Sequence, residues 1–414
     1  MRVAHVLRKY DPRHWGGTES AVLELLRGLE AQGVESVVYA PRLDEPAGAA
    51  DPIADLGIEV RRFGAFLPTL GISPEARARS LSVGGNIVSF SAPRMLFFDR
   101  KVDLVHSHVL GRLGGAARTV ARLRGLPFVV SIHGGYLDIP PNVRDQLEAP
   151  TRGGFEYGRA FGALMGARRV VEKADAVITC NPREAELLTR KLPARRVVRM
   201  PHGIPTEQFS VDQRASVFDA WPALRDRNLV LCVGRIDAVK NQRFLVERYA
   251  ALRASLPNTV LVLAGGETDA AYARSLHELV RKEGLDDVVF TGGLAPRDPR
   301  LIGLYQAASV FVLPSLTETF GIVVLEAWAA KTPVLTTATS GTRQLVEHGA
   351  NGFFFDLEDP ASFDAPLRQL LTDRNLAHRV AERGERLVRE QYDTTQVAGR
   401  FKALYEEISA RHLP

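Results

Sequence analysis

The sequence predicts an α/β protein with two doubly wound parallel sheets, one in each half of the chain. Short apolar strands alternate with helical segments along most of the 414 residues. This alternation stops near residue 200 and begins again at residue 229. The length also suits two domains of about 200 residues each. We therefore expect ligands to bind beyond the carboxyl ends of the strands, as in other open parallel sheets.

The N-terminal half begins with an apolar strand at residues 2–7, followed by a loop and by a helix at residues 18–32. The other strands expected here are residues 35–40, 58–62, 103–106, 127–132, 176–179 and 197–200, and the other helices are 112–124, 155–173 and 182–191. Residues 63–101 are less regular and carry apolar and basic side chains. They are the best candidate for a surface that meets an acceptor or a lipid headgroup.

The C-terminal half repeats the alternation. Its expected strands are residues 229–233, 260–264, 288–291, 310–313, 333–336 and 352–355, and its expected helices are 242–255, 270–283, 297–307, 321–330 and 342–348. Helical segments at residues 360–371, 374–391 and 395–411 close the chain. A segment rich in proline and polar residues, around 201–222, joins the halves. We expect domains at residues 1–205 and 206–392, followed by a C-terminal segment at 393–414.

The composition, 45% hydrophobic and 24% charged, is typical of a soluble globular protein. The longest uncharged stretch, residues 301–317, contains Gln306 and Pro314 and fits a helix and a strand better than a membrane span. We find no signal peptide pattern at the start of the chain. Cys180 and Cys232 each end an apolar run, so we expect reduced core residues in a cytoplasmic protein.

The net charge of +5 is unevenly distributed. Residues 1–202 carry 29 Lys and Arg against 21 Asp and Glu, whereas residues 203–414 carry 24 against 27. The arginines are scattered and not interleaved with aromatic residues, so we expect no nucleic acid partner. The basic half is compatible with a solvated surface, or with a peripheral contact with anionic lipid at the inner face of the membrane.

The stretch PSLTETFGIVVLEA, from Pro314 to Ala327, organises the C-terminal half. A buried strand ends at its first residue, a polar loop carries Glu318, and a helix begins near Phe320 with Glu326 in its second turn. The N–H groups and the dipole at such a helix start favour an anionic ligand. The two carboxylates could then bind hydroxyl groups of the same ligand.

Other loops after strands carry complementary chemistry. Arg235 and Lys240 are five residues apart in VGRIDAVKN, where two cations suit a diphosphate, although a solvated loop is the alternative. Gly265-Gly266 in LAGGETD lets a ligand approach the backbone. In the N-terminal half, Gly16-Gly17 precedes the first helix and could approach a phosphate, or form an ordinary turn.

Histidines follow two N-terminal strands. His106 and His108 form an H-x-H pair, but no acidic or cysteine ligands accompany them at metal-binding spacing, so we expect no metal. His133 ends the next strand in SIHGG. It could form a hydrogen bond with a sugar hydroxyl or a leaving phosphate, or it could be a satisfied core histidine.

Together these segments resemble the retaining glycosyltransferases of family 4, the group 1 glycosyltransferases with the GT-B fold. The resemblance rests on GGTES, SIHGG, PHGIPTEQF, GRIDAVKN, LAGGE, FTGGL, the E-x7-E motif in ETFGIVVLE, and GTRQLVEHGANGFFF. It extends over nearly the whole chain and is weakest at residues 63–101 and 136–155. His202, in PHGIP, stands where many relatives carry asparagine.

The resemblance implies roles for single residues. Arg235, Lys240 and the helix start would hold the donor diphosphate, Glu326 the ribose, and Glu318 the donor sugar, while His133 would lie near the reacting centre. The implied catalytic residues are His133, Glu318, Arg235 and Lys240; the donor-binding residues are Gly16, Gly17, Arg235, Lys240, Gly265, Gly266, Thr319, Phe320, Gly321, Ile322, Val323 and Glu326; the acceptor-binding residues are His108 and Tyr136.

The family implies two facing Rossmann-like domains with the active site in the cleft between them, the first binding the acceptor, and a last helix that crosses back to the first domain. It also implies transfer of a hexosyl group from a nucleotide-diphosphate sugar to a hydroxyl of a glycan, a lipid-linked or a small acceptor. We expect no cofactor and no metal, since the sequence has no Asp-x-Asp motif. A nucleotide-sugar epimerase, a phosphorylase and a catalytically silent binding protein remain alternatives.

Overall fold

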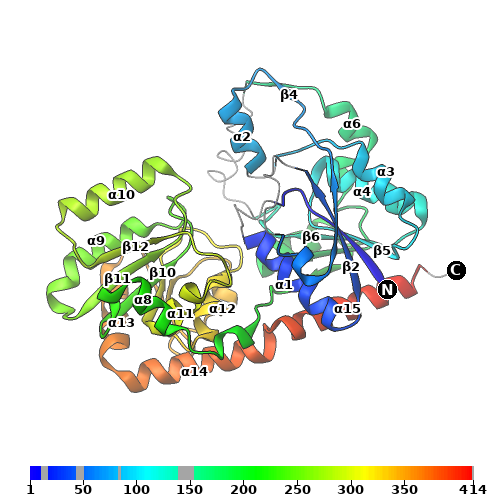
Figure 1. The fold of residues 1–414 in the computed structure, drawn as a ribbon. Helices are drawn as coiled ribbons and strands as arrows, with labels where there is room; N and C mark the ends of the chain where they lie inside the picture. The colour runs from blue at the N-terminus through cyan, green and yellow to red at the C-terminus, as the bar shows by residue number, and fades with distance from the viewer. Residues whose placement is uncertain (11–16, 43–50, 83–84, 139–152, 413–414) are drawn as a thin grey trace. The chain divides into compact units, whose positions relative to one another are not determined.

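The computed structural model describes residues 1–10, 17–42, 51–82, 85–138 and 153–412. The chain forms two compact units, Met1–Gly203 with Thr394–Pro414, and Ile204–Asp393. Each unit contains a parallel sheet covered by helices, as Figure 1 shows. The predicted class, two parallel α/β domains, is confirmed.

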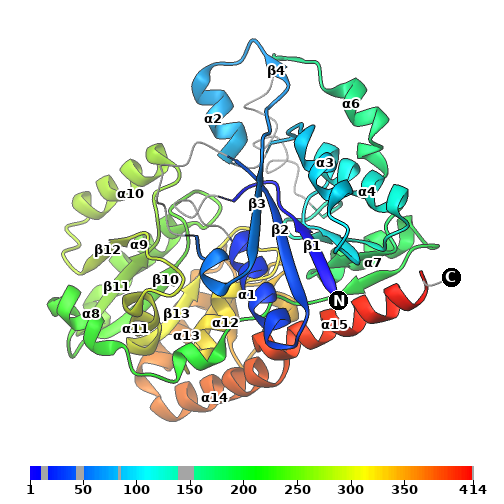
Figure 2. The same cartoon turned by 45° about the vertical axis from the view of Figure 1, so that its right-hand side comes forward.

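The first unit has a seven-stranded sheet in the order β3-β2-β1-β5-β6-β8-β9. These strands are β1 (Arg2–Val6), β2 (Glu35–Pro41), β3 (Glu59–Phe63), β5 (Leu104–Ser107), β6 (Phe128–Ile132), β8 (Ala176–Thr179) and β9 (Val197–Arg199). All neighbouring pairs are parallel, and the run of β3, β2 and β1 can be followed in Figure 2. Its helices are α1 (Gly17–Ala31), α2 (Pro74–Ser82), α3 (Ser91–Phe98), α4 (Gly111–Arg124), α6 (Arg159–Leu164), α7 (Pro182–Lys191) and α15 (Thr394–Ala410).

The second unit has a six-stranded parallel sheet in the order β12-β11-β10-β13-β14-β15. These strands are β10 (Asn228–Val233), β11 (Thr259–Ala264), β12 (Val288–Gly292), β13 (Ala308–Leu313), β14 (Val334–Thr337) and β15 (Phe353–Phe355). Its helices are α8 (Arg214–Ala220), α9 (Gln242–Leu252), α10 (Ala270–Lys282), α11 (Pro299–Ala307), α12 (Ile322–Ala329), α13 (Pro360–Thr372) and α14 (Arg374–Gln391). The inner strands of both sheets are buried, because helices cover the sheets, whereas the edge strands β3, β9 and β12 are only partly buried.

Three expectations need correction. Residues 155–173 form the short strand β7 (Phe155–Glu156), α6 and a 3₁₀ turn (Ala167–Arg169) instead of one helix. Gly166 lies between the last two with φ +62°, a left-handed conformation that ends a helix. Residues 342–348 contain only the 3₁₀ turn Thr342–Gln344. Residues 63–101, expected to be irregular, contain α2, α3 and the strand β4 (Thr69–Leu70), which pairs antiparallel with β7.

The C-terminal helix α15 packs against α1 within the first unit. Gly28 of α1 permits this close approach, because a Cβ atom there would lie 2.6 Å from Cβ of Ala398 and 2.8 Å from the carbonyl oxygen of Thr394. The Nζ of Lys402 in α15 donates to the carbonyl of Gln32, just after α1, over 2.9 Å. This hydrogen bond restrains the two helices from sliding past each other. Phe401, Leu404 and Tyr405 of α15 are buried against the sheet.

Cys180 and Cys232 are buried free thiols, in agreement with the prediction. Burial raises the pKa of each thiol to about 12, so both stay protonated at neutral pH. Within the described part of the chain, none of the helices has the length and apolar character needed to cross a bilayer.

Gly28→Ala should lower the free energy of unfolding by about 1–3 kcal/mol, because the added methyl group overpacks the α1–α15 contact. The change is informative because alanine is otherwise the better helix former by about 1 kcal/mol. Urea unfolding followed by circular dichroism measures it. Gly399→Ala in α15 is the matched control, since its Cβ would approach no described atom closer than 3.5 Å; equal stability of the two variants would contradict the packing argument.

Candidate active-site residues

The second unit brings two glycine loops together at the carboxyl edge of its sheet. They follow β10 and β11, which are neighbours in the sheet. A Cβ atom on Gly265 would lie only 1.9 Å from the carbonyl oxygen of Gly234, so glycine is required for this approach. The N–H of Ile236 donates to the carbonyl of Gly266 over 2.9 Å and continues the pairing beyond the strands. Gly265 and Gly266, which we expected to bind the donor, therefore pack against the loop that carries Arg235 and hold it in place.

Lys240 and Glu318 come from different loops of this edge and form an ion pair through Nζ and Oε1. The hydroxyl of Ser315 donates to the same carboxylate oxygen over 2.8 Å. The side chains of Lys240 and Glu318 are only 19% and 11% exposed, so their attraction is weakly screened. An ammonium group has three donors. The pair thus holds a cation at the edge of the sheet while leaving it donors for ligand oxygens.

Arg235 lies on the same loop as Lys240, and its side chain is 59% exposed. Its guanidinium nitrogen is 3.1 Å from a carboxylate oxygen of Asp237. Asp237 is buried, and its other oxygen accepts the N–H groups of Val239 and Lys240 over 3.0 Å each. One carboxylate therefore shapes the loop and orients Arg235.

The loop after β13 leads into α12, which begins at Ile322, one residue after the start of the expected helix at 321–330. Gly321 precedes it with φ +96°, in the region that favours glycine. Gly341 packs beneath this loop, since a Cβ there would lie 2.5 Å from the nitrogen of Phe320. Its N–H donates to the carbonyl of Glu318 over 2.8 Å. The predicted donor-binding residues placed here are Thr319, Phe320, Gly321, Ile322 and Val323.

Glu326 lies in the second turn of α12, as predicted, and is half-buried. One of its carboxylate oxygens accepts the hydroxyl of Tyr305 over 2.7 Å. Burial and the nearby Glu326 carboxylate raise the pKa of Tyr305 well above its ordinary value, so Tyr305 remains a hydrogen-bond donor. This contact fixes the rotamer of Glu326.

In the first unit, Gly17 is the first residue of α1, and a Cβ atom there would meet no described atom within 4 Å. Packing among the described residues therefore does not require glycine at this position. Gly16 lies outside the described residues. The phosphate contact expected of this pair stays a prediction.

Histidines form a polar layer on the sheet face beneath α1 and α15. Residues two positions apart on a strand face the same side of a sheet. On this face an apolar residue of each strand is followed, two positions later, by a polar one: Val3 by His5, Leu104 by His106, and Val129 by Ser131. His5 and His106 are partners in the parallel ladder. His106 forms hydrogen bonds of 2.7 Å with the hydroxyls of Tyr405 and Ser131, so the layer also ties α15 to the sheet.

A second set of contacts connects histidines in a chain. Nδ1 of His5 is 3.1 Å from Nε2 of His108, and Nδ1 of His108 is 2.9 Å from Nε2 of His133. The rings of His133 and His202 stack with centroids 5.5 Å apart. We call His5, His108 and His133 the histidine chain.

Burial lowers the pKa of these imidazoles far below the ordinary value of 6.5. The pKa is about 3 for His5 and His133, about 4 for His202, and well below the ordinary value for His106 and His108. All five are therefore neutral at pH 7, and each has one donor and one acceptor nitrogen.

The contacts of His108 argue against the acceptor-binding role that the family resemblance implies. Its side chain is buried, and both of its ring nitrogens are occupied by His5 and His133. It therefore has no polar atom left for an acceptor substrate. Tyr136, the other predicted acceptor residue, is exposed, and the Nζ of Lys191 lies 5.7 Å from its ring centroid. Its role stays a prediction.

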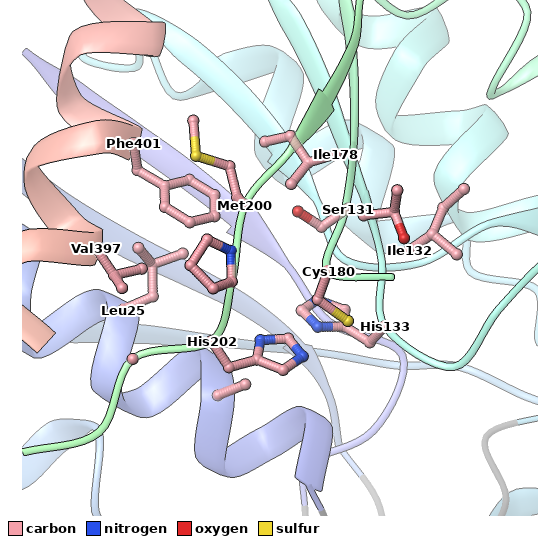
Figure 3. A pocket seen from close by; sticks show the side chains of 14 residues that line it. Leu25, Ser131, Ile132, His133, Ile178, Cys180, Met200, His202, Val397 and Phe401 are labelled. Atoms are coloured by element: carbon pink, nitrogen blue, oxygen red, sulfur yellow. The ribbon is translucent and has the colours of Figure 1, made fainter. Parts of the chain in front are cut away.

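Figure 3 shows a pocket of the first unit beside His133. Cys180 and His202 line it together with His133, and apolar side chains of α1 and α15 close it on the other side. The lining residues are Ala21, Leu25, Ser131, Ile132, His133, Ile178, Thr179, Cys180, Met200, Pro201, His202, Gly203, Val397 and Phe401.

Sequence reasoning missed several residues of these sites. His5 was counted only as part of an apolar strand, and a polar residue at an inward position of such a strand is the signal that could have found it. Asp237 stood between the two predicted cations and could have been proposed as their support. Tyr305 and Tyr405 are distant in sequence from their partners, Glu326 and His106, so no local pattern identifies them.

His5, His106 and His108 are close enough to be considered as metal ligands, because their ligand atoms lie within 4.8 Å of one another. However, His106 uses both nitrogens for hydrogen bonds, and His5 and His108 are bonded to each other. A metal would have to replace these hydrogen bonds. The expectation of a metal-free protein stays a prediction.

Comparisons with known proteins support the same family over both units. A family profile described as "Glycosyl transferase 4-like domain" matches residues 16–203, and one described as "Glycosyl transferases group 1" matches residues 214–387. The chain is 29% identical over 411 residues to D-inositol 3-phosphate glycosyltransferase 2 of Catenulispora acidiphila, covering 94% of this chain and 90% of the relative. It is 31% identical to alpha-D-kanosaminyltransferase of Streptomyces kanamyceticus, covering 73% and 77% of the two chains.

Solved structures share the fold. HepE of Anabaena, in complex with UDP and glucose, has a TM-score of 0.71 at 16% identity, with 98% of this chain and 99% of that chain covered. Sucrose-phosphate synthase of Thermosynechococcus elongatus has a TM-score of 0.73 at 23% identity, with 99% of both chains covered. At these identities the likeness concerns the fold.

Because these histidines are neutral in the folded state, we expect acid to destabilise the fold. Because the pKa of His5 is about 3 in the folded state and 6.5 when exposed, the unfolded state binds more protons below pH 6.5. The free energy of unfolding should therefore fall as the pH falls from about 6.5 toward 3. In His5→Phe, the loss between pH 7 and pH 5 should be smaller by about 2 kcal/mol.

Urea unfolding at both pH values measures this difference. The control is His378→Gln, because His378 is exposed on α14, where its Nδ1 lies 3.4 Å from a carboxylate oxygen of Glu382 at the surface. The same pH dependence in His5→Phe and in the unsubstituted chain would show that His5 is not a neutral buried group.

Proposed function

The chain belongs to the group 1 glycosyltransferases of family 4, and from this premise we propose that it transfers a hexosyl group from a nucleotide-diphosphate sugar to a hydroxyl acceptor, retaining the anomeric configuration. The observation that carries the proposal is the edge of the second sheet, where Arg235, Lys240 and the start of α12 gather around the glycine loops. Two cations and free helix N–H groups suit a diphosphate.

The carboxylates beside this edge suit the neutral parts of such a donor. Glu326 is fixed by Tyr305 and Glu318 by Lys240 and Ser315, so both carboxylates are oriented before a ligand binds. Carboxylate oxygens accept hydrogen bonds from sugar hydroxyls. We assign Glu326 to the ribose and Glu318 to the transferred sugar. HepE, which has this fold, is described in complex with UDP-glucose, and this supports the same class of donor.

We assign catalysis to charge stabilisation on the departing diphosphate. In a front-face reaction, the acceptor oxygen bonds to the anomeric carbon on the side from which the phosphate leaves, and a phosphate oxygen takes the acceptor proton. Arg235 and Lys240 would stabilise the negative charge that develops there. This mechanism uses neither Glu318 nor Glu326 as a covalent nucleophile. The mechanism needs no metal and no cofactor.

Incubation with UDP-, GDP- and ADP-sugars and a panel of hydroxyl acceptors tests the function. Release of nucleoside diphosphate with formation of a glycoside that has the anomeric configuration of the donor supports the proposal. An epimerised donor would indicate an epimerase, and phosphate-dependent formation of a sugar phosphate would indicate a phosphorylase. Inversion of configuration would contradict the retaining mechanism.

Lys240→Ala and Arg235→Ala should each raise the activation barrier by about 2–4 kcal/mol, the scale of losing one donor to a developing charge. Initial-rate kinetics measure this loss as kcat/KM. Arg300→Ala is the matched control, since Arg300 is an exposed cation of the same unit that pairs with Asp298. If the double variant of Arg235 and Lys240 retained nearly full activity, the phosphate site would be wrongly assigned.

Glu326→Ala should weaken donor binding, because we assign Glu326 to the ribose of the donor.

We further propose that the first unit contacts an anionic membrane surface through an exposed aromatic patch. The patch consists of Phe66, Leu70, Phe90, Phe155 and Tyr157, which are 40–70% exposed. Leu70 and Phe155 face each other across the β4–β7 pair, and the Phe66 ring lies 6.2 Å from Phe90 and 6.5 Å from Tyr157. Figure 2 shows β4 near α2 and α6 at the top of the view.

Basic residues accompany this patch. The Arg159 side chain, at the start of α6, is 84% exposed, with its Nε 3.5 Å from a carboxylate oxygen of Glu156. The 3₁₀ turn that follows α6 carries the exposed Arg168 and Arg169. Leu164, at the end of α6, is 78% exposed. Exposed apolar side chains next to arginines are typical of surfaces that bind anionic lipid.

Phe90→Ser combined with Phe155→Ser should lower binding to phosphatidylglycerol-containing vesicles at least tenfold, because each phenyl group contributes roughly 1.5–3 kcal/mol when buried. Vesicle sedimentation measures the binding. Phe98→Ser is the control, since Phe98 is 65% exposed but its ring packs against Phe97 and not against the patch residues. Equal binding of all variants, or no preference for anionic over neutral vesicles, would contradict the membrane contact.

A further inference from the structure

We propose that His108 and His5 are positioning residues that hold His133 in the tautomer with its proton on Nδ1. His133 would then donate a hydrogen bond to a ligand oxygen and could not act as a general base through that atom. The inference rests on the proposed function only for the identity of this oxygen, a sugar hydroxyl or a phosphate of the donor. The tautomer itself follows from the contacts within the first unit.

The proposal begins with the connectivity of the histidine chain. Two hydrogen bonds join three imidazoles, from Nδ1 of His5 to Nε2 of His108 and from Nδ1 of His108 to Nε2 of His133. A neutral imidazole carries one proton. Both bonds can therefore form in only two ways, with every proton on Nδ1 or with every proton on Nε2. The tautomer of any one ring fixes that of the other two.

The two arrangements differ at the ends of the chain. With every proton on Nδ1, the unused N–H is at Nδ1 of His133; with every proton on Nε2, it is at Nε2 of His5. Each of these atoms is buried and has no hydrogen-bond partner among the described residues. The surroundings of the two ends therefore determine which arrangement is more stable.

The two ends lie in different surroundings. His5 is 0% exposed in the middle of the sheet, on β1, so an N–H at its Nε2 would stay unpaired in every ligand state. His133 is half-buried and lines the pocket in Figure 3; its Nδ1 is covered in this structure, so a water or ligand oxygen in the pocket accepts its proton after a small movement of the neighbouring side chains. An unpaired buried donor costs about 1–3 kcal/mol. The arrangement with the donor at the pocket is therefore the more stable one.

His106 lies in the same layer, but it does not change which of the two proton arrangements is more stable. Its Nδ1 is bonded to Tyr405 and its Nε2 to Ser131, so it competes for neither nitrogen of His108. The ring of His5 stacks on that of His108, with centroids 5.4 Å apart and an angle of 15° between the planes, which further restricts their rotation. Among the described residues, the hydrogen bonds of the histidine chain thus run from the core of the sheet to the pocket without a branch.

The ¹⁵N shifts of histidine-labelled full-length protein test the tautomer directly. Single-histidine variants provide the assignments. We expect His5, His108 and His133 each to show a protonated Nδ1 and a bare Nε2 at pH 7. A protonated Nε2 on His133 would overturn the proposal. One equivalent of zinc in the purified protein, with metal-shifted resonances of His5, His106 and His108, would also overturn it in favour of a metal site.

His108→Phe tests the positioning role. We expect His133 to lose its single tautomer and kcat to fall roughly tenfold, on the scale seen when a supporting hydrogen bond is removed, while KM for the donor changes less than twofold. If His108→Phe does not fold, His5→Phe is the second variant for the same test, because it leaves the hydrogen bond between His108 and His133 in place. His378→Gln, at an exposed position on α14, is the control.

An unchanged His133 tautomer in both folded variants would contradict the role of the chain. Because the NMR measurement needs no turnover, it stands apart from the proposed activity. If the unsubstituted chain transfers no sugar, the proposed function fails, but the expected tautomer can still be found. If the chain transfers sugar while His133 carries its proton on Nε2, only the present inference fails.

Discussion

The parallel pairing of strands is the constraint on which the rest of this structure depends. It places all carboxyl ends of a sheet at one edge, so that the loops after β10, β11 and β13 must share a small space. The carbonyl of Gly234 can lie against Gly265 only because the latter has no side chain. Gly341 has the same function beneath the loop of Glu318. These glycines let three loops place charged side chains at one edge.

Once gathered, the charged groups are held by partners of opposite charge or by hydrogen bonds. A cation that is mostly removed from water needs such a partner, because the desolvation of an isolated charge costs several kcal/mol. Lys240 is such a cation and has Glu318 as its partner, while the more exposed Arg235 is oriented by Asp237. Such pairs add little net stability, since attraction and desolvation largely cancel. They fix the direction of each donor before a ligand arrives, and preorganised donors of this kind stabilise developing charge effectively.

The sequence predicted the features that depend on local pattern. Strand–helix alternation gave the two parallel sheets, and the spacing of Arg235, Lys240, Glu318 and Glu326 placed them correctly on loops or on α12. It failed where long-range contacts decide the outcome. A helical pattern at residues 155–173 is interrupted because part of it pairs with β4, a contact between strands far apart in sequence. The partners of His106 and Glu326 likewise depend on how helices pack against the sheet, which no local spacing encodes.

The candidate site residues of the two units differ in charge. The second unit uses charged side chains near its surface, where water and a diphosphate can share the field of Arg235 and Lys240. The first unit also holds five buried or half-buried imidazoles, and the loss of water around them keeps them neutral. A neutral donor has no net charge to compensate in the core, yet it can still bind an oxygen. Its limitation is that a neutral imidazole can carry its proton on either nitrogen, so a hydrogen-bonded neighbour must select one tautomer. A row of linked histidines provides that selection and carries it from the middle of the sheet to the pocket.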